Sequence, residues 1–302
     1  MNNDTETKLV LIDGNAVMHR AFHALPNLTT TLGEPINAVY GFISMLLRII
    51  QDIKPTHIAV CFDRAEPTFR KKEFEKYQSK RPEMDAQLSS QFAKMQDTLR
   101  AIGIPVYDKA GFEADDLIGT ISKLAKVNKV IIVTGDKDIL QLVDDKTKVY
   151  MPTKGMSEGK LYGDIEVKEK LGVTPKQIID LKALIGDSSD NYPGVPGIGP
   201  KTATKLIEDY NNLENIYSHL NDIKEAIKNK LVNGRESGFL CKKLATIVRD
   251  VDVDFDLKDS GKWKIDNPDV IDLFADFGFR TLTKRVQEVG KLVQSENQMT
   301  LL

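Results

Sequence analysis

The segment LKALIGDSSDNYPGVPGIGPKTATKLI, which runs from Leu181 to Ile207, determines how the second half of the chain is interpreted. It carries two aspartates at a spacing of three, Asp187 and Asp190, followed by three glycines and three prolines within ten residues. A lysine and a helical pattern of apolar residues come next. Side chains spaced by three lie on one face of a helix or turn. The segment therefore joins an acidic pair to a rigid turn and to the start of a helix.

The turn is a candidate contact for nucleic acid. Glycines allow positive φ and close backbone approach, and Pro200 suits the first position of a helix. The free N–H groups at that helix start can bind a phosphate oxygen, and the loop carbonyls can hold a monovalent cation such as K⁺. The motif GVPGIGPKTA predicts a helix–hairpin–helix, which binds the nucleic-acid backbone without base-specific contacts. The alternative is an ordinary tight turn. The residues concerned are Gly194, Gly197, Gly199, Lys201 and Thr202.

Upstream of this segment, short apolar runs alternate with helical patterns. Lys8–Gly14, His57–Asp63 and Lys129–Asp138 have the composition of buried parallel strands, and each contains an aspartate at or near its end. Strands that alternate with helices predict an α/β fold with a mostly parallel sheet flanked by helices.

The pattern divides the chain into four regions. Residues 1–174 are expected to form the α/β domain, and residues 175–260 a helical subdomain that contains the helix–hairpin–helix. Residues 261–290 are predicted to be helices that pack back on the α/β body, and residues 291–302 a flexible tail. No internal repeat or low-complexity tract is present.

Composition narrows the class of protein. With 302 residues and 41% hydrophobic content the chain can bury a sizeable core. The net charge is −2, but residues 64–81 hold seven basic and three acidic residues, which is typical of a phosphate-binding segment. The two cysteines are expected to be buried thiols in a reducing compartment. A polar N-terminus and the lack of a long apolar run predict a cytoplasmic protein that does not contact membranes.

The acidic residues carry the chemistry. Asp13, Asp63 and Asp136 each end a predicted strand, and the carboxyl ends of parallel strands share one edge of a sheet. Like charges at one edge are unfavourable unless cations compensate. Each aspartate alone is explained by capping or by a solvated turn, but the whole set predicts Mg²⁺ or Mn²⁺. At least two ions are expected, about 3.5–4 Å apart, as in phosphodiester cleavage. The remaining candidates are Glu113, Asp115, Asp116, Asp138, Asp187 and Asp190.

Taken together, the motifs resemble one family, the 5′ nucleases, which includes flap endonucleases and the N-terminal 5′–3′ exonuclease domain of bacterial DNA polymerase I. The resemblance extends from Lys8 to Val289. It is carried by LIDGNAVMHRAFHA, FDRAEPTFRKKEFEKYQSKRP, GFEADDLIGT, VTGDKDILQLV and the opening segment. It implies that all nine carboxylates belong to metal sites, several of them through water. The tighter first site would take Asp13, Asp63, Glu113 and Asp115, and the second would take Asp136, Asp138, Asp187 and Asp190.

The resemblance also implies an arch over the active site, from Arg64 to about Ser89, under which single-stranded 5′ ends pass. Interleaved aromatics at Phe69, Phe74 and Tyr77 would stack on bases, while basic residues neutralise phosphates; the alternative is a solvated amphipathic helix. The expected catalytic residues are Arg20, Arg70, Tyr77, Gln78 and Arg81, and those expected to bind DNA include Lys72, Lys76, Lys80, Lys182 and Lys201.

Gln78 departs from the family pattern. Many members have a lysine directly after the arch tyrosine, and it helps to activate the scissile phosphate. A glutamine can donate a hydrogen bond but supplies no charge. The nearby cations Lys76, Lys80 and Arg81 are the alternatives for that role. The resemblance still implies a working enzyme.

The last five residues, QMTLL, resemble the short peptide by which bacterial replication proteins bind the sliding clamp. Gln298 would fill a polar pocket, and Leu301 and Leu302 an apolar one; the alternative is a disordered end. The chain is expected to be either a free-standing nuclease or a fragment from which a polymerase region is missing.

The function implied is a structure-specific 5′–3′ exonuclease and 5′-flap endonuclease, active on DNA and on RNA primers in primer removal and repair, as a monomer. Two other interpretations remain. One is a catalytically impaired module of the same fold that only binds DNA structures. The other is a PIN-like ribonuclease, against which the helix–hairpin–helix argues.

Overall fold

The computed structural model describes residues 6–153 and 159–300, and only the backbone of residues 296–300. At its centre lies a six-stranded sheet in the order β3-β2-β1-β4-β5-β6. Its strands are β1 Lys8–Asp13, β2 His57–Cys61, β3 Val106–Tyr107, β4 Lys129–Val133, β5 Thr147–Pro152 and β6 Gly159–Tyr162. Neighbouring strands are parallel except β6, which runs antiparallel to β5. The α/β fold with a mostly parallel sheet is therefore confirmed. The pair β5–β6 has no counterpart in the sequence prediction, because its runs mix polar and apolar residues.

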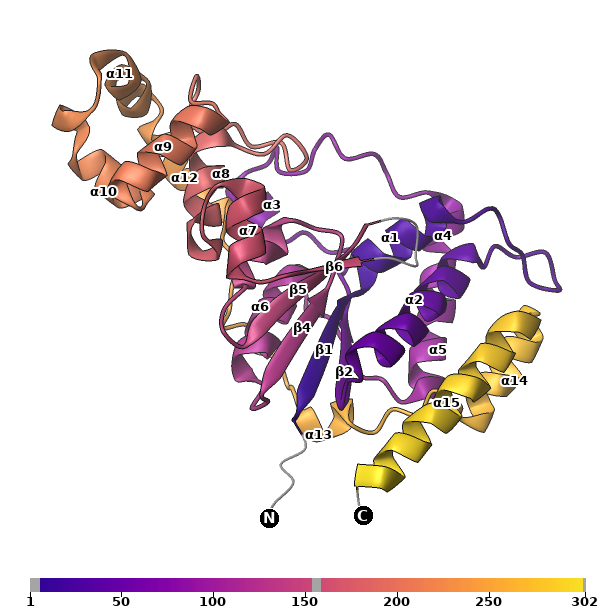
Figure 1. Ribbon diagram of the computed structural model, residues 1–302. Coiled ribbons are helices and arrows are strands. Elements are labelled where there is room, and N and C mark those ends of the chain that lie inside the picture. Colours follow the sequence, from indigo (N-terminus) through magenta and orange to yellow (C-terminus); the bar gives the residue numbers. More distant parts are fainter. Residues whose placement is uncertain (1–5, 154–158, 301–302) are drawn as a thin grey trace.

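Both faces of the sheet are covered by helices. Alternate side chains of a strand point to opposite faces, so Leu9 and Leu11 belong to one buried cluster and Val10 and Ile12 to another. The first cluster contains α6, and the second contains α1, α2, α5, α14 and α15 (Figure 1). These helices are α1 Gly14–Ala24, α2 Asn37–Ile53, α5 Gln91–Ile102, α6 Ala114–Leu124, α14 Pro268–Phe277 and α15 Arg280–Thr300. The result is a helix–sheet–helix sandwich whose strand ends remain accessible.

A group of helices extends from one end of the sheet (Figure 1, salmon to orange). Leu184, Ala203 and Leu213 of this group belong to the same buried cluster as α6, so the core is continuous. Its helices are α7 Asp164–Leu171, α8 Ile178–Ile185, α9 Pro200–Tyr210, α10 Leu213–Ser218, α11 Glu225–Asn233 and α12 Arg235–Ala245. The short 3₁₀ turns are η1 Asp138–Leu142, η2 Pro175–Gln177 and η3 Leu220–Asp222.

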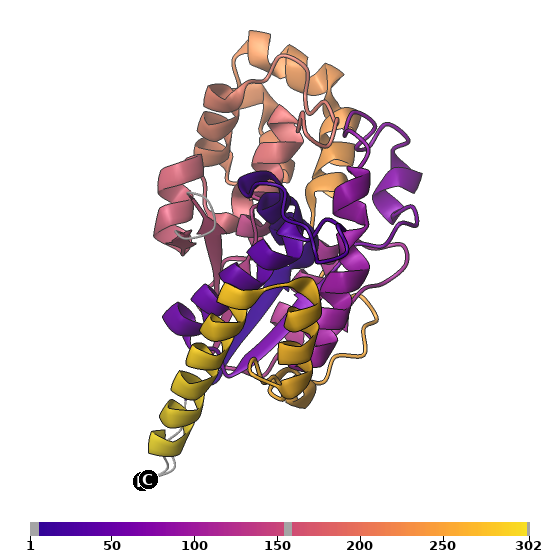
Figure 2. The ribbon, with the colours of Figure 1, turned by 90° about the vertical axis from the view of Figure 1, so that its right-hand side faces the viewer.

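The chain then returns along α6 to the α/β body. The N–H of Val248 donates to Asp116 (2.9 Å), and that of Val251 to the hydroxyl of Thr120 (3.1 Å). After α13, Leu257–Ser260, the helices α14 and α15 contact α5 and α2. Figure 2 shows α14 and α15 together on this side of the body. No helix in the described part of the chain could span a membrane.

The C-terminal region differs from the prediction of a flexible tail over residues 291–302. The helix α15 continues through this region to Thr300. After Gly290 the sequence has no glycine or proline to end a helix, and Val293 packs against the core cluster on that side. Gln298 lies in the helix, but its side chain, Leu301 and Leu302 lie outside the described residues, so the clamp peptide stays a prediction.

The segment predicted as an arch, residues 64–89, contains two short helices, α3 Phe69–Glu73 and α4 Ala86–Ser89. Between them the chain is irregular and runs from the helical group across to the α/β body (Figure 1). It passes on the side where β1, β2 and β4 end, and its residues line the cleft described next.

Candidate active site

The ends of β1 and β2 and the start of α6 bring carboxylates together at one edge of the sheet. Asp13 caps α1: its Oδ1 accepts from the N–H of Ala16 (2.9 Å), and its Oδ2 accepts from the hydroxyl of Thr134 (2.7 Å). The Oδ1 of Asp63 accepts from the N–H of Ala114 (2.7 Å). These carboxylates are thus held by helix-start and loop geometry, as expected for aspartate at such positions.

The sheet-edge group is defined here as Asp13, Asp63, Glu113 and Asp115. Desolvation raises the pKa of Asp13 to about 7, against the hydrogen bonds that it accepts. Desolvation also raises the pKa of Glu113 to about 7, although Arg70 opposes this. For Asp115, desolvation and the neighbouring carboxylates together raise the pKa well above its ordinary value. At neutral pH the group must therefore retain protons or bind cations.

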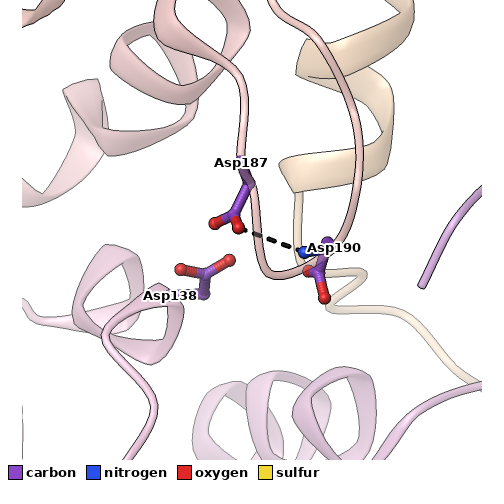
Figure 3. A group of neighbouring side chains, drawn as sticks. All are labelled: Asp138, Asp187 and Asp190. Atoms are coloured by element: carbon purple, nitrogen blue, oxygen red, sulfur yellow. Dashed lines mark hydrogen bonds between the residues drawn. The ribbon is translucent and has the colours of Figure 1, made fainter. Parts of the chain in front are cut away.

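A second set, the loop group, consists of Asp138, Asp187 and Asp190 (Figure 3). Asp138 begins η1, and the other two lie in the turn after α8, where the N–H of Asp190 donates to Asp187 (3.1 Å). One oxygen from each carboxylate lies within 4.8 Å of the others. Lys182 bridges the carboxylates of Asp138 and Asp187, and Arg81 lies 2.6 Å from Asp190. Lys182 thus neutralises this group, and its expected contact with the DNA backbone stays a prediction.

Asp136 lies between the two groups. Its N–H donates to the hydroxyl of Thr134 (3.0 Å), which also bonds Asp13, and its Oδ1 accepts from the N–H of Asp138 (2.8 Å). Desolvation is the main cause that raises the pKa of Asp115 and of Asp138, and the negative charge of Asp136 is the second. Together with weaker causes they bring the pKa of Asp138 to about 6. The two groups are therefore electrostatically linked.

Asp116 is a correction to the predicted ligand set. It is fully buried, and both of its oxygens accept hydrogen bonds from the guanidinium of Arg70 (2.7 and 2.8 Å). Arg70 also donates to the carbonyl of Leu244 (2.9 Å), so the pair joins α3, α6 and the end of α12. Consecutive helical residues point about 100° apart, and Asp115 occupies the position that faces the cleft. The pair is structural. Arg70 also lies 3.3 Å from Glu113 and lines the cleft, so its catalytic role stays a prediction.

The middle of the arch folds onto both carboxylate groups. The hydroxyl of Tyr77 lies 3.2 Å from Glu113 and 3.3 Å from Asp190. The N–H of Gln78 donates to the carbonyl of Asp190 (2.9 Å), and Gln78 has a φ of +54°. Arg81 follows with its ion pair to Asp190. The arch is therefore anchored at the loop group.

Tyr77 is packed inside the protein, which corrects the expectation that it stacks on bases, whereas Phe69 and Phe74 are half-buried and their stacking stays a prediction. Tyr77 is 4% exposed, and Phe74 packs against the same small apolar cluster. The ring of Phe69 lies 6.0 Å from that of Phe112 and is covered by Arg70. The lysines Lys72, Lys76 and Lys80 are exposed, so a role for their charge stays a prediction.

These residues line one open cleft of about 1360 Å³. Arg20 reaches it from α1, and Tyr77, Gln78 and Arg81 from the arch. Seven of the nine predicted carboxylates form its wall, namely Asp13, Asp63, Glu113, Asp115, Asp136, Asp138 and Asp190. Asp187 joins them through the loop group, and Asp116 is the one that is buried elsewhere.

The hairpin between α8 and α9 depends on two glycines with positive φ. A Cβ on Gly186 would lie 2.5 Å from the carbonyl carbon of Pro193, and one on Gly194 would lie 2.3 Å from the nitrogen of Gly186. Only glycine permits this approach of the two backbones. Lys230 donates to the carbonyl of Gly197 (3.1 Å). Gly197, Gly199 and Lys201 are exposed at the start of α9, and Thr202 is half-buried.

The donor set fits a hard divalent cation. The two groups and Asp136 supply carboxylate oxygens, the ligands that Mg²⁺ and Mn²⁺ prefer. A bound cation would also remove the unfavourable charge that raises the pKa of the sheet-edge group.

Two family models match consecutive parts of the chain. The first, described as a 5′-3′ exonuclease N-terminal resolvase-like domain, covers residues 8–172, and the second, a 5′-3′ exonuclease C-terminal SAM fold, covers residues 173–270. The chain belongs to the 5′–3′ exonuclease family. Membership in this exonuclease family confirms the class predicted from the motifs, a nuclease that acts in the 5′–3′ direction.

Curated relatives of this exonuclease chain are larger proteins. DNA polymerase I of Bacillus caldotenax is 42% identical over 283 residues, which is 93% of the chain and 32% of the relative. DNA polymerase I of Bacillus subtilis is 41% identical over 284 residues, with the same coverage. The chain therefore spans about a third of the length of these relatives.

Solved structures share the exonuclease fold. The D15 protein of phage T5, co-crystallised with metal ions, has a TM-score of 0.65 at 22% identity and covers 95% of the chain and 99% of its own. Flap endonuclease-1 of Methanococcus jannaschii has a TM-score of 0.61 at 19% identity, and the match covers 97% of this chain and 95% of that protein. The Rad2 catalytic core, solved with a DNA substrate, has a TM-score of 0.62 at 19% identity, and the match covers 95% of this chain and 93% of that protein. At these identities the likeness establishes the fold.

Sequence reasoning missed the neutral residues that hold the carboxylates of this exonuclease site. The Oδ1 of Asn15 accepts from the N–H of Asp63 (2.9 Å), and the hydroxyl of Thr68 donates to Glu113 (3.1 Å). Thr134 links Asp13 to Asp136. Two of these residues lie two positions from a predicted ligand, so a search for hydrogen-bonding side chains beside each aspartate would have found Asn15 and Thr134.

Proposed function

We propose that this chain is a phosphodiesterase dependent on Mg²⁺ or Mn²⁺ that acts at 5′ ends, nicks and 5′ flaps of DNA, and on the RNA part of primers. Its products would carry a 5′-phosphate, and its role would be primer removal and repair. The observation that supports this most is the position of Asp187 and Asp190. They lie on the same rigid segment as the hairpin that presents Lys201, so the site of cleavage and the backbone contact are held at a fixed separation.

The proposed chemistry divides among the described residues. Divalent ions, when bound, would supply an acidic water and neutralise charge on the phosphate. The sheet-edge group and the loop group would hold these ions, and Asp136 would link them. Arg20 and Arg81 line the cleft and can orient a phosphate by bidentate hydrogen bonds. Exposed N–H groups at the start of α9 would hold the duplex backbone.

Gln78 need not supply a charge in this arrangement. Its N–H bonds the carbonyl of Asp190, and Arg81, three residues later, brings a guanidinium to the carboxylate of the same residue. Arg81 is half-exposed and can turn toward a phosphate when an ion takes over Asp190. We therefore assign to Arg81 the activating charge that other family members take from a lysine.

The proposal extends to a monovalent ion, a protein partner, the oligomeric state and the location of the chain. A K⁺ ion at the hairpin would have to share the Gly197 carbonyl with Lys230. Binding of the sliding clamp through the C-terminal residues, a monomeric state and a cytoplasmic location agree with the sequence and are proposals of the same kind.

The test is cleavage of a 5′-labelled flap DNA. The parent should cut near the flap junction with Mg²⁺ and not with EDTA. Asp187→Ala should cut at least about a hundred-fold more slowly. Asp97→Ala, which removes an exposed carboxylate on α5, is the matched control and should cut like the parent. Tight binding of the flap without cutting by the parent would favour the alternative, a catalytically impaired module that only binds DNA structures.

A further inference from the structure

One of the residues that join the arch to the loop group, Asn191, does not line the cleft. We call residues 74–81 the arch base and residues 187–192 the aspartate loop. The side-chain amide of Asn191 donates to the carbonyl of Lys76 (2.9 Å) and to the hydroxyl of Ser79 (2.9 Å). A backbone bond runs parallel to these, from the N–H of Gln78 to the carbonyl of Asp190 (2.9 Å). Together with the contacts of Tyr77 and Arg81 to the Asp190 carboxylate, five hydrogen bonds join two segments more than a hundred residues apart.

The aspartate loop holds Asn191 in a fixed orientation. Asp187 and Tyr192 exchange two backbone hydrogen bonds (2.9 and 3.0 Å), which close the loop. Inside it, Asp187 accepts from the N–H groups of Ser189 (2.7 Å) and Asp190 (3.1 Å). Asn191 then has a φ of +58°, a conformation that asparagine tolerates better than most residues. Its side chain is thereby directed at the arch base.

We propose that Asn191 is a positioning residue that couples the arch to the loop group, so that the two become ordered together. This inference rests on the proposed function of the cleft. The arch base carries Tyr77, whose hydroxyl reaches Glu113 and Asp190, and Arg81, which pairs with Asp190. Without the amide of Asn191, the arch base would be joined to the aspartate loop only through Asp190. Its carbonyl accepts from Gln78, and its carboxylate contacts Tyr77 and Arg81. A metal ion bound by the Asp190 carboxylate would compete with Tyr77 and Arg81 for it, and the hydrogen bonds of Asn191 would then keep the arch base in place.

The substitution that isolates the amide is Asn191→Gly, because glycine retains the positive φ. The arch base offers a direct probe, since Lys76 and Lys80 are exposed and are sites for trypsin. Trypsin should cut the arch of Asn191→Gly about ten-fold faster than that of the parent, because cleavage follows the population of the open segment. The assay is run without DNA or metal, with the cut sites identified by mass spectrometry. An unchanged rate of cutting at these lysines would overturn the proposal.

Asn211→Gly is the matched control. Asn211 also has a positive φ (+75°) and a side chain that is hydrogen-bonded, to Gln177, but it lies at the end of α9 away from the arch. It shares the entropic cost of the added glycine. Asn211→Gly should leave cutting at Lys76 and Lys80 unchanged; equal acceleration in both variants would mean general loosening and would contradict the coupling.

A milder variant, Ser79→Ala, removes only one acceptor and should accelerate cutting two- to five-fold, by about the effect of one hydrogen bond. Because this bond is made by Asn191, Ser79→Ala should add nothing in the Asn191→Gly background. Full additivity of the two substitutions would overturn the assignment of this contact.

Flap cleavage supplies a readout that a purely structural role would not move. Asn191→Gly should lower kcat about ten-fold and leave KM within two-fold, because the hairpin that holds the duplex is unchanged. A rise in KM alone would contradict a positioning role. If the parent itself proves inactive, the trypsin assay still tests the contact, so failure of the proposed function and failure of this inference remain distinguishable.

Discussion

The sheet-edge group and the loop group lie in one cleft but balance their charge in opposite ways. In the sheet-edge group, Asp13 and Asp63 accept hydrogen bonds from neutral donors, and desolvation raises their pKa values. In the loop group, Lys182 bridges two carboxylates and Arg81 pairs with the third. In the first group Arg70 lies 3.3 Å from Glu113 but is shared with Asp116, so the group as a whole needs an added cation, whereas each carboxylate of the second group is paired with a cation of the chain.

This difference predicts different behaviour toward metal ions. An ion that enters the sheet-edge group relieves repulsion, whereas an ion that enters the loop group must displace Lys182 or Arg81. The sheet-edge group should therefore bind its ion more tightly. That order agrees with the tighter first site implied by the family resemblance, and it can be tested one group at a time.

The largest expected effect is the loss of a sheet-edge carboxylate. Asp115→Asn should slow single-turnover cleavage of a 5′ flap at least about a thousand-fold, since the ion there loses a ligand that nothing replaces. Asp187→Asn should slow it about a hundred-fold. Quenched-flow cleavage under saturating Mg²⁺ measures both, with Asp97→Asn as the control. If the loop-group variant were the slower one, the proposed order of the two groups would be reversed.

The next effect concerns two arginines of the arch. Arg70→Met should lower the free energy of unfolding by about 3 kcal/mol, because it leaves the buried carboxylate of Asp116 without its partner. Arg81→Met should change it by less than about 1 kcal/mol, since Arg81 is half-exposed. Urea unfolding of both variants is the measurement. Similar values for the two would contradict the structural assignment of Arg70.

The pH dependence of stability tests the sheet-edge group without DNA. The pKa of Asp13 is about 7 in the folded protein against an ordinary 3.8, so this group contributes stability below pH 4 that is lost as the pH rises through 7. Asp13→Asn removes this loss. In EDTA the stability of the variant relative to the parent should rise by up to roughly 4 kcal/mol between pH 4 and pH 8, at about 1.4 kcal/mol per unit of pKa shift.

Mg²⁺ supplies the control for that experiment. It should raise the melting temperature of the parent at pH 8 more than that of Asp13→Asn, because only the parent offers the full set of ligands. A parent whose stability relative to Asp13→Asn does not change with pH would show that the Asp13 carboxyl is not desolvated.

The sequence predicted the sheet, the hairpin and most of the cleft because these depend on local patterns. Apolar runs that end in aspartate place Asp13 and Asp63 at one edge whatever packs around them, and the hairpin forms by the local approach of Gly194 to Gly186, eight residues earlier. The acidic residues of FEADD, GDKD and the opening segment supplied the remaining candidates, and the resemblance divided the carboxylates between two metal sites. The α-helical continuation after Gly290 was missed because it depends on distant contacts: Val293 packs against the core cluster, and Gln294 donates to Asp266 (3.0 Å).

Contacts between distant segments account for the remaining errors. Asp115 and Asp116 are indistinguishable in sequence, and only the arrival of Arg70 from the arch decides which of them is buried. Lys182 matches a family lysine that holds the duplex backbone, and the sequence did not show that the position of Asp138 on η1 also makes it part of the loop group. Pairings of this kind depend on tertiary geometry, to which no single window of sequence is sensitive.

The smallest expected effect separates the two groups most directly. Lys182→Met removes the ammonium that an ion must displace from Asp138 and Asp187, so Mn²⁺ should bind the loop group about ten-fold more tightly, or roughly 1.4 kcal/mol. Calorimetry in the Asp115→Asn background isolates this site, because the sheet-edge group is then weakened. Lys201→Met, which removes an exposed lysine at the start of α9, is the control and should leave the affinity unchanged. Weaker binding by Lys182→Met would mean that Lys182 supports the ion instead of competing with it, and the contrast between the two groups would then lie in desolvation alone.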